Sequence, residues 1–240
     1  MKVSIIIPIY NEEKFLPTVL KDIRKLPFSK ELILVNDCSQ DRTQEILTEE
    51  EKQYDDTVVI NHTKNYGKGF AIRSGLEKAS GDIIIIQDAD LEYEPEDIIK
   101  VLQPIIDGKT RVSYGSRFMG SVKNMRLPNY VANKLLSLFV SILFFHRITD
   151  EATAYKAFHK DLIHSIRLDC QGFEFCPEIT AKVLRLGEKI TEVPINFSAR
   201  TVAEGKKIGW RDFFIAVKTL IKYRFQPKEK FYYELGSRNI

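Results

Sequence analysis

Residues 82–92 run Asp-Ile-Ile-Ile-Ile-Gln-Asp-Ala-Asp-Leu-Glu, and this stretch decides the fold. Four consecutive isoleucines between polar residues are typical of a strand buried on both faces, as in a parallel sheet. Asp88 and Asp90 follow the strand directly, and ligands of open α/β sheets bind at the carboxyl ends of the strands. Two hard oxygen ligands so close together suit Mg²⁺ or Mn²⁺, which would bridge to a substrate diphosphate. The plainer alternative is a solvated acidic turn, because Asp-x-Asp is a common sequence.

The chain on both sides of this stretch alternates between strand-like and helix-like segments. Apolar, β-branched runs predict strands near residues 3–7, 31–36, 57–61, 82–87 and 111–115. Helical periodicity predicts helices near residues 13–25, 43–53, 68–78 and 96–106. Farther on, the sequence indicates an extended segment at 150–158, a helix at 173–186, a strand at 189–193, a polar loop at 200–207 and a helix at 210–223. Repeated βαβ units predict an α/β fold with a mostly parallel sheet flanked by helices.

Composition is that of an ordinary globular protein. The 240 residues are 44% hydrophobic and 29% charged, which fits one domain, and the net charge of +3 is too small to argue for a nucleic-acid partner. Basic residues concentrate between Gly205 and Lys230. The three cysteines form no Cys-x-x-Cys pair and favour a reducing compartment. Because Met1-Lys2 leads straight into a strand without a targeting signature, we expect a cytoplasmic protein.

The most apolar stretch is Leu135–Phe145, inside a helix expected at 131–145. It is shorter than the roughly 20 residues that a bilayer span needs, so we expect it not to cross a membrane. Asn133, Ser137 and Ser141 recur every four residues and form a narrow polar stripe on an otherwise apolar helix. Such a helix is either buried on two sides or in contact with lipid.

Polar residues follow the other early strands as well. Pro8, Tyr10 and Glu12 come after the first strand, where they either enter the ligand crevice or form a capping turn. Asp37 follows the second strand and is placed like the acid that binds a ribose or base.

A glycine-rich segment follows the third strand. Gly67 and Gly69 flank Lys68 at the start of a predicted helix, where backbone and lysine together suit a phosphate. A turn with a solvated lysine is the alternative, because the P-loop pattern is absent. Arg117 stands at the end of the fifth strand.

In this order these residues resemble glycosyltransferase family 2, whose members have the GT-A fold and take a sugar from a nucleotide diphosphate. The resemblance covers essentially the whole chain. Its second half is similar to the dolichyl-phosphate mannosyltransferase branch and its bacterial polyprenyl-phosphate relatives, in segments 149–158, 172–178, 192–195 and 200–208.

The resemblance implies a role for each position. It places the nucleotide against Pro8, Tyr10, Glu12, Asp37, Lys68, Asp88 and Ala89. It implies a Mg²⁺ or Mn²⁺ site at Asp88, Asp90 and Glu92, although the family often has Gln at the last position. Arg117 and Arg126 match arginines near the acceptor phosphate, and Arg200 and Lys206 match a pair in a mobile loop that clamps the donor diphosphate. The catalytic set is then Asp88, Asp90, Arg117, Arg200 and Lys206.

The expected chemistry explains these residue types. Displacing a nucleoside diphosphate from a sugar builds negative charge that a divalent cation and a basic clamp stabilise. The fold implies in-line attack with inversion. A lipid phosphate is already anionic, so it needs cations to steer it but no general base. A saccharide acceptor would need a carboxylate base, for which Asp150 is the candidate.

We therefore expect one domain, with a nucleotide-sugar half at 1–120, an acceptor half and mobile loop at 121–208 and a basic amphipathic tail at 209–240. The predicted last helix has an apolar face and a basic face, so it rests on a membrane surface or docks on the protein. The apolar face holds Trp210, Phe213, Phe214, Val217, Leu220 and Ile221, and the basic face holds Arg211, Lys218 and Lys222. After it, 227–240 would be a short polar tail, and any membrane attachment would be peripheral or through a membrane-protein partner.

The expected function is transfer of a hexose from a GDP-mannose- or UDP-glucose-type donor to a polyprenyl or dolichyl phosphate at the cytoplasmic membrane face. The alternatives are a family 2 enzyme with a saccharide acceptor in cell-surface polysaccharide synthesis, and a nucleotide-sugar-binding protein without turnover.

Overall fold

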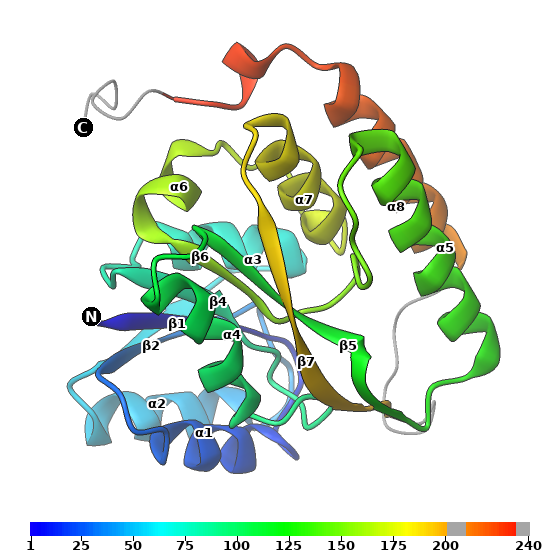
Figure 1. Ribbon diagram of the computed structural model, residues 1–240. Helices are drawn as coiled ribbons and strands as arrows, with labels where there is room; N and C mark the ends of the chain where they lie inside the picture. Colours follow the sequence, from blue (N-terminus) through cyan, green and yellow to red (C-terminus); the bar gives the residue numbers. More distant parts are fainter. Residues whose placement is uncertain (201–209, 234–240) are drawn as a thin grey trace.

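A seven-stranded sheet organises the chain (Figure 1). The computed structural model describes residues 1–200 and 210–233. The strands are β1 (Val3–Ile9), β2 (Lys30–Asn36), β3 (Thr57–Asn61), β4 (Ile83–Ile86), β5 (Val112–Lys123), β6 (Lys156–His159) and β7 (Ile190–Ser198). Their order across the sheet is β3-β2-β1-β4-β6-β5-β7. The predicted mostly parallel α/β sheet is confirmed, and β6 is antiparallel to both of its neighbours.

Helices cover both faces of the sheet. They are α1 (Leu16–Arg24), α2 (Thr43–Gln53), α3 (Lys68–Leu76), α4 (Asp97–Ile106), α5 (Leu127–Phe144), α6 (Lys160–Ser165), α7 (Phe175–Arg185) and α8 (Trp210–Phe225). Side chains of β1 alternate between two cores: Ile5 and Ile7 pack with α1, α2 and α4, whereas Ile6 packs with α3 and the later helices. All four isoleucines of β4 are buried, which explains why that strand has no polar face.

Helix α5 is longer than the apolar stretch Leu135–Phe145 from which it was predicted. Its 18 residues make it, within the described part of the chain, the one helix long and apolar enough to cross a membrane by length and composition. The expectation that this stretch was too short is therefore wrong. Ser137 on its polar stripe is buried and accepts a hydrogen bond from Glu151 N, and Ser141 accepts one from Ile148 N.

The polar stripe of α5 thus faces the protein, and apolar side chains face outward. The exposed ones are Leu127, Tyr130, Val131, Leu135, Leu138 and Ile142, followed by Phe145 just after the helix. The helix is buried on one side only, where Ser137 and Ser141 bind the backbone of residues 148–151. Its free side is apolar.

Helix α8 lies beside α5 and packs on α7 (Figure 1). Ala216, Leu220 and Tyr223 are buried, whereas Phe214 and Ile221, predicted to lie on the same apolar face, are exposed. The predicted face is therefore divided between the core and the surface.

The segment after α8 is not merely a polar tail. A short 3-10 helix at Lys228–Lys230 leads to Phe231, which is 0% exposed. The carbonyl of Phe231 accepts a hydrogen bond from Arg167 N, and Tyr232 forms a β-bridge with Ile166. The prediction of a polar tail is wrong for these residues because an aromatic anchor binds them to the core.

Candidate active site

A cavity of about 750 Å³ opens at the carboxyl ends of β1, β2 and β4. Residues from both halves of the chain line it, as expected for an open α/β sheet. The predicted site residues that it gathers are Pro8, Tyr10, Glu12, Asp37, Lys68, Asp88, Ala89, Asp90, Glu92, Arg117, Arg126 and Arg200. Lys206, the other member of the predicted clamp, lies outside the described residues.

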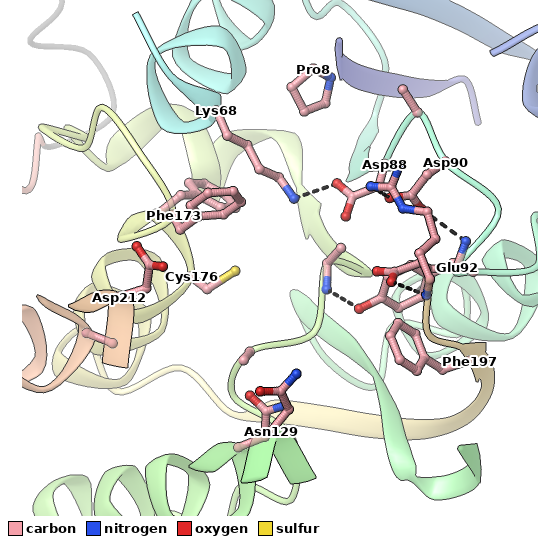
Figure 2. A pocket seen from close by; sticks show the side chains of 18 of the residues that line it. Pro8, Lys68, Asp88, Asp90, Glu92, Asn129, Phe173, Cys176, Phe197 and Asp212 are labelled. Carbon is pink, nitrogen blue, oxygen red and sulfur yellow. Dashed lines mark hydrogen bonds and ion pairs between the residues drawn. The ribbon is translucent and has the colours of Figure 1, made fainter. Parts of the chain in front are cut away.

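Each carboxylate of the acidic pair is bound by a cation (Figure 2). Lys68, the first residue of α3, places its Nζ 2.5 Å from Oδ1 of Asp88. Arg200, just past β7, places Nη2 2.6 Å from Oδ2 of Asp90. The solvated acidic turn is excluded for Asp90, whose side chain is only 6% exposed.

Burial is the main reason why the pKa of Asp90 rises to about 7. The negative charge of neighbouring Asp88 raises it further, whereas the guanidinium of Arg200 lowers it. A buried carboxylate beside a partly buried one makes a site that favours an added positive charge.

The carboxylate of Glu92 is not grouped with those of Asp88 and Asp90 in this structure, and its role as a metal ligand stays a prediction. Its Oε1 accepts a hydrogen bond of 2.7 Å from the backbone N of Arg200. No group of three His, Cys, Asp or Glu side chains suited to a metal occurs among the residues that the structure describes. The expected three-carboxylate set is therefore not assembled. Two carboxylates still fit Mg²⁺ or Mn²⁺, which commonly take one or two protein carboxylates and complete their shell with phosphates and water.

Glu12 holds the other side of Arg200. Its two carboxylate oxygens lie 3.1 and 3.2 Å from Nη1 of Arg200. Glu12, which was expected to bind the nucleoside, therefore contacts Arg200, which was expected to clamp the diphosphate. Through this contact Arg200 connects the end of β1 to the end of β7.

Asp37 organises the loop before α3. Its Oδ1 accepts a hydrogen bond from Tyr66 N at 2.9 Å and also lies 2.7 Å from Nδ1 of His62. Its Oδ2 accepts a hydrogen bond from Gly67 N at 2.7 Å. The carboxylate is 3% exposed and lines the cavity. Direct contact with a nucleoside remains a prediction for Asp37; what the structure shows is that it fixes the loop beside that part of the cavity.

The glycines flanking Lys68 have a packing role. A Cβ on Gly67 would lie 2.6 Å from the carbonyl oxygen of Gln171, and one on Gly69 would lie 2.7 Å from that of Gly172. Gly67 also has a φ of +96°, which favours glycine. Close contact between two backbone segments, rather than with a phosphate, thus accounts for both residues in this structure.

Arg117 is paired within the protein. Its Nε and Nη2 each donate a 2.7 Å hydrogen bond to Asp150, and its backbone N donates another. Burial lowers the pKa of Arg117, but the charges of Asp150 and Tyr93 and the hydrogen bond to Asp150 together raise it above the ordinary value. Both oxygens of the fully buried Asp150 are taken, so it is not placed to act as a general base.

Arg126 differs from Arg117 in its exposure and in its partners. It is the residue before α5, it is exposed, and it lines the cavity. It has no ion pair with another residue in 1–200 or 210–233. Of the two arginines expected near the acceptor phosphate, Arg126 is the one free to bind it.

Comparison with known proteins agrees with this geometry. A model of glycosyl transferase family 2 matches residues 4–167. The chain belongs to this family. It is 34% identical to UDP-N-acetylglucosamine–dolichyl-phosphate N-acetylglucosaminyltransferase of Methanococcus voltae, over 88% of this chain and 93% of that protein. It is 30% identical to undecaprenyl-phosphate mannosyltransferase of Micrococcus luteus, over 87% and 88%.

Two further similarities concern length and fold. The chain is 32% identical, over 93% of its residues, to dolichol-phosphate mannosyltransferase of Pyrococcus furiosus, but it spans only 62% of that protein. Glucosyl-3-phosphoglycerate synthase from Mycobacterium tuberculosis, solved with Mn²⁺, UDP-glucose and phosphoglyceric acid, superposes with a TM-score of 0.72 at 20% identity. The match covers 94% of this chain and 80% of that one, and it identifies the GT-A fold.

The cavity of this glycosyltransferase also includes residues that the sequence did not indicate. Asn129 and Asn133 come from α5, Phe173 and Cys176 from the start of α7 and the turn before it, and Asp212 from α8 (Figure 2). The polar stripe was the one available signal for Asn133. The others come from elements whose packing against the first half depends on tertiary structure.

Proposed function

We propose that this glycosyltransferase moves a hexose from a nucleotide diphosphate sugar, of the GDP-mannose or UDP-glucose type, to a polyprenyl or dolichyl phosphate with inversion. One observation carries the proposal. A single cavity holds the Asp88/Asp90 pair and also reaches the exposed Arg126, at the start of a helix whose free face is apolar. The names of the relatives, which act on dolichyl and undecaprenyl phosphates, support the same acceptor class.

The donor occupies the end of the cavity formed by the first half of the chain. Asp88 and Asp90 would hold Mg²⁺ or Mn²⁺, which supplies Lewis-acid stabilisation of the leaving diphosphate. Lys68 and Arg200 add positive charge within reach of the same group. Pro8, Tyr10 and Asp37 line the part that we assign to the nucleoside.

The acceptor end requires a cation but no base. A phosphate monoester is already ionised near neutral pH, and Arg126 is available to bind it. Asp150, the base that a saccharide acceptor would need, is occupied by Arg117. This favours the lipid phosphate over the saccharide.

We propose that the enzyme works at the cytoplasmic membrane face as a peripheral protein or with a membrane-protein partner. The exposed apolar side chains of α5 and α8 support contact with lipid, because they lie on adjacent helices that also line the cavity.

Transfer from radiolabelled UDP-glucose and GDP-mannose, with and without polyprenyl phosphate, tests the proposal. Arg126→Ala should raise the acceptor KM at least about ten-fold, the cost of one charge-assisted contact, and leave nucleotide affinity unchanged. Lys123→Ala is the matched control, since Lys123 is exposed at the end of β5 and does not line the cavity. Turnover with saccharide acceptors alone would contradict the proposal, as would an Arg126→Ala variant with unchanged acceptor kinetics.

A further inference from the structure

The cations on the acidic pair occupy the positions that a divalent ion needs. Lys68 Nζ lies 2.5 Å from Asp88, and Arg200 Nη2 lies 2.6 Å from Asp90. An ion bridging the two carboxylates would compete with both contacts, because each cation lies within hydrogen-bonding distance of an oxygen that the ion would use.

The protein by itself provides an incomplete metal site. Glu92 is held by the backbone of Arg200, and no third protein ligand gathers around the pair in the described chain. Remaining ligands must come from water or from the donor. A diphosphate provides such oxygens, and it also provides new anionic partners for the displaced lysine and arginine.

We propose that Lys68 and Arg200 hold the place of the divalent cation in the donor-free enzyme and pass to the diphosphate when metal and donor bind. Glu12 is the anchor that keeps Arg200 in reach during the exchange, because it binds Nη1 while Nη2 contacts Asp90. This inference rests on the proposed metal-dependent donor site and not on the identity of the acceptor.

Thermodynamic coupling follows from this exchange. Metal binding frees the two cations for the diphosphate, and the diphosphate removes them from the carboxylates, so each ligand strengthens the binding of the other by the same factor. Metal alone should bind weakly because it must displace two ion pairs without compensation.

Mn²⁺ binding, followed by electron paramagnetic resonance of free Mn²⁺, measures this directly. The affinity is determined for the protein alone, with UDP and with GDP. In the wild type at least one nucleotide should tighten Mn²⁺ binding by about five-fold or more, the usual lower range of coupling between sites. Lys68→Met and Arg200→Met should each bind Mn²⁺ alone more tightly than the wild type does and show a smaller nucleotide effect.

Two controls define the result. Lys64→Met makes the same charge change four residues away, at an exposed lysine near the Tyr66 ring, and should match the wild type. Asp88→Asn should lose Mn²⁺ binding, which locates the signal. Circular dichroism of both cation variants checks folding.

The inference is overturned if neither cation variant binds Mn²⁺ alone more tightly, or if neither nucleotide alters the Mn²⁺ affinity of the wild type. Failure of the proposed function would look different. A wild type that shows the coupling but transfers no sugar to polyprenyl phosphate would exclude the acceptor and leave the exchange intact.

Discussion

Two neighbouring carboxylates in this protein differ in their contacts. Asp150 and Glu151 are adjacent and both are fully buried. Arg117 donates hydrogen bonds to both carboxylate oxygens of Asp150. Burial raises the pKa of Glu151 to about 7, the charge of Lys156 opposes the shift, and the charge of Asp150 adds to it. Burial is thus the main influence on the protonation of Glu151.

Glu151 should make stability depend on pH. The folded protein keeps a proton on Glu151 that the unfolded chain loses above the ordinary pKa of 4.5, so stability falls as pH rises from 4.5 to about 7 and then levels off. The full effect is about 3 kcal/mol. Urea unfolding of wild type and Glu151→Gln at pH 5 and pH 8 should show the variant gaining relative stability at pH 8. Parallel changes in the two proteins would refute this.

The acidic pair should be needed for turnover but not for folding. Asp90→Ala should abolish transfer and Asp88→Ala should cripple it, because each removes a ligand expected to connect protein and diphosphate. Both residues lie in the loop after β4, so far-ultraviolet circular dichroism should match the wild type. EDTA should stop the wild type, and added Mn²⁺ should restore it. Full turnover in EDTA would exclude the metal-dependent mechanism.

At the scale of elements, a buried lysine joins the end of the chain to α7. Lys182 is fully buried, donates to the carbonyl of Arg167 and pairs with Glu178. Its Nζ also lies 4.2 Å from the centre of the Tyr223 ring and 5.5 Å from that of Phe231. These contacts fix α8, and therefore the wall of the cavity that α8 provides.

Phe231→Ala should destabilise the protein by about 3 kcal/mol or more, the cost of emptying a buried aromatic site. Tyr232→Ala is the matched control, because the side chain of Tyr232 is exposed and its bridge to Ile166 uses the backbone. Chemical unfolding measures both. Equal losses in the two variants would show that the tail is not anchored through the Phe231 ring.

The sequence predicted elements where local pattern and burial agree. The isoleucines of β4 and the strand-end acids needed no knowledge of the rest of the chain, and their positions were confirmed. The face of α5 was different: periodicity separated its serines from its apolar residues but did not say which side meets the protein. The serines turn inward because the backbone of 148–151, the turn that follows α5, folds back and offers them partners, which periodicity within the helix does not reveal. The placement of β6 between β4 and β5 depended on pairing between segments far apart in the sequence.

At the scale of the whole molecule, exposed apolar side chains gather on the outer sides of the adjacent helices α5 and α8. Ile142 is 65% exposed, Phe145 87% and Phe225 74%, on the adjacent helices α5 and α8 or at their ends. The other layer carries less prominent ones, such as Ile106 at 46% on α4. One side of the molecule is therefore suited to lipid, and it is the side formed by helices that line the cavity.

The double substitution Ile142→Ser and Phe145→Ser should weaken binding to vesicles of phosphatidylcholine and phosphatidylglycerol by about ten-fold or more, given the apolar surface lost. Ile106→Ser, on the opposite layer, should leave binding unchanged. Flotation assays compare the three proteins. Added salt should also weaken the binding of the wild type to vesicles, because it screens the basic residues near α8. Equal flotation of all three would exclude this side as the membrane contact.

The position of β6 also has a consequence during synthesis on the ribosome. Residues 83–86 form a strand of four isoleucines whose free edge is covered only when residues 156–159 pair with it. At ordinary translation rates the nascent chain carries that open edge for about 4 to 15 s. An uncovered hydrophobic strand is a template for pairing with other chains. The growing polypeptide is therefore most exposed to aggregation, and most dependent on chaperones, in the interval before its sixth strand has been made.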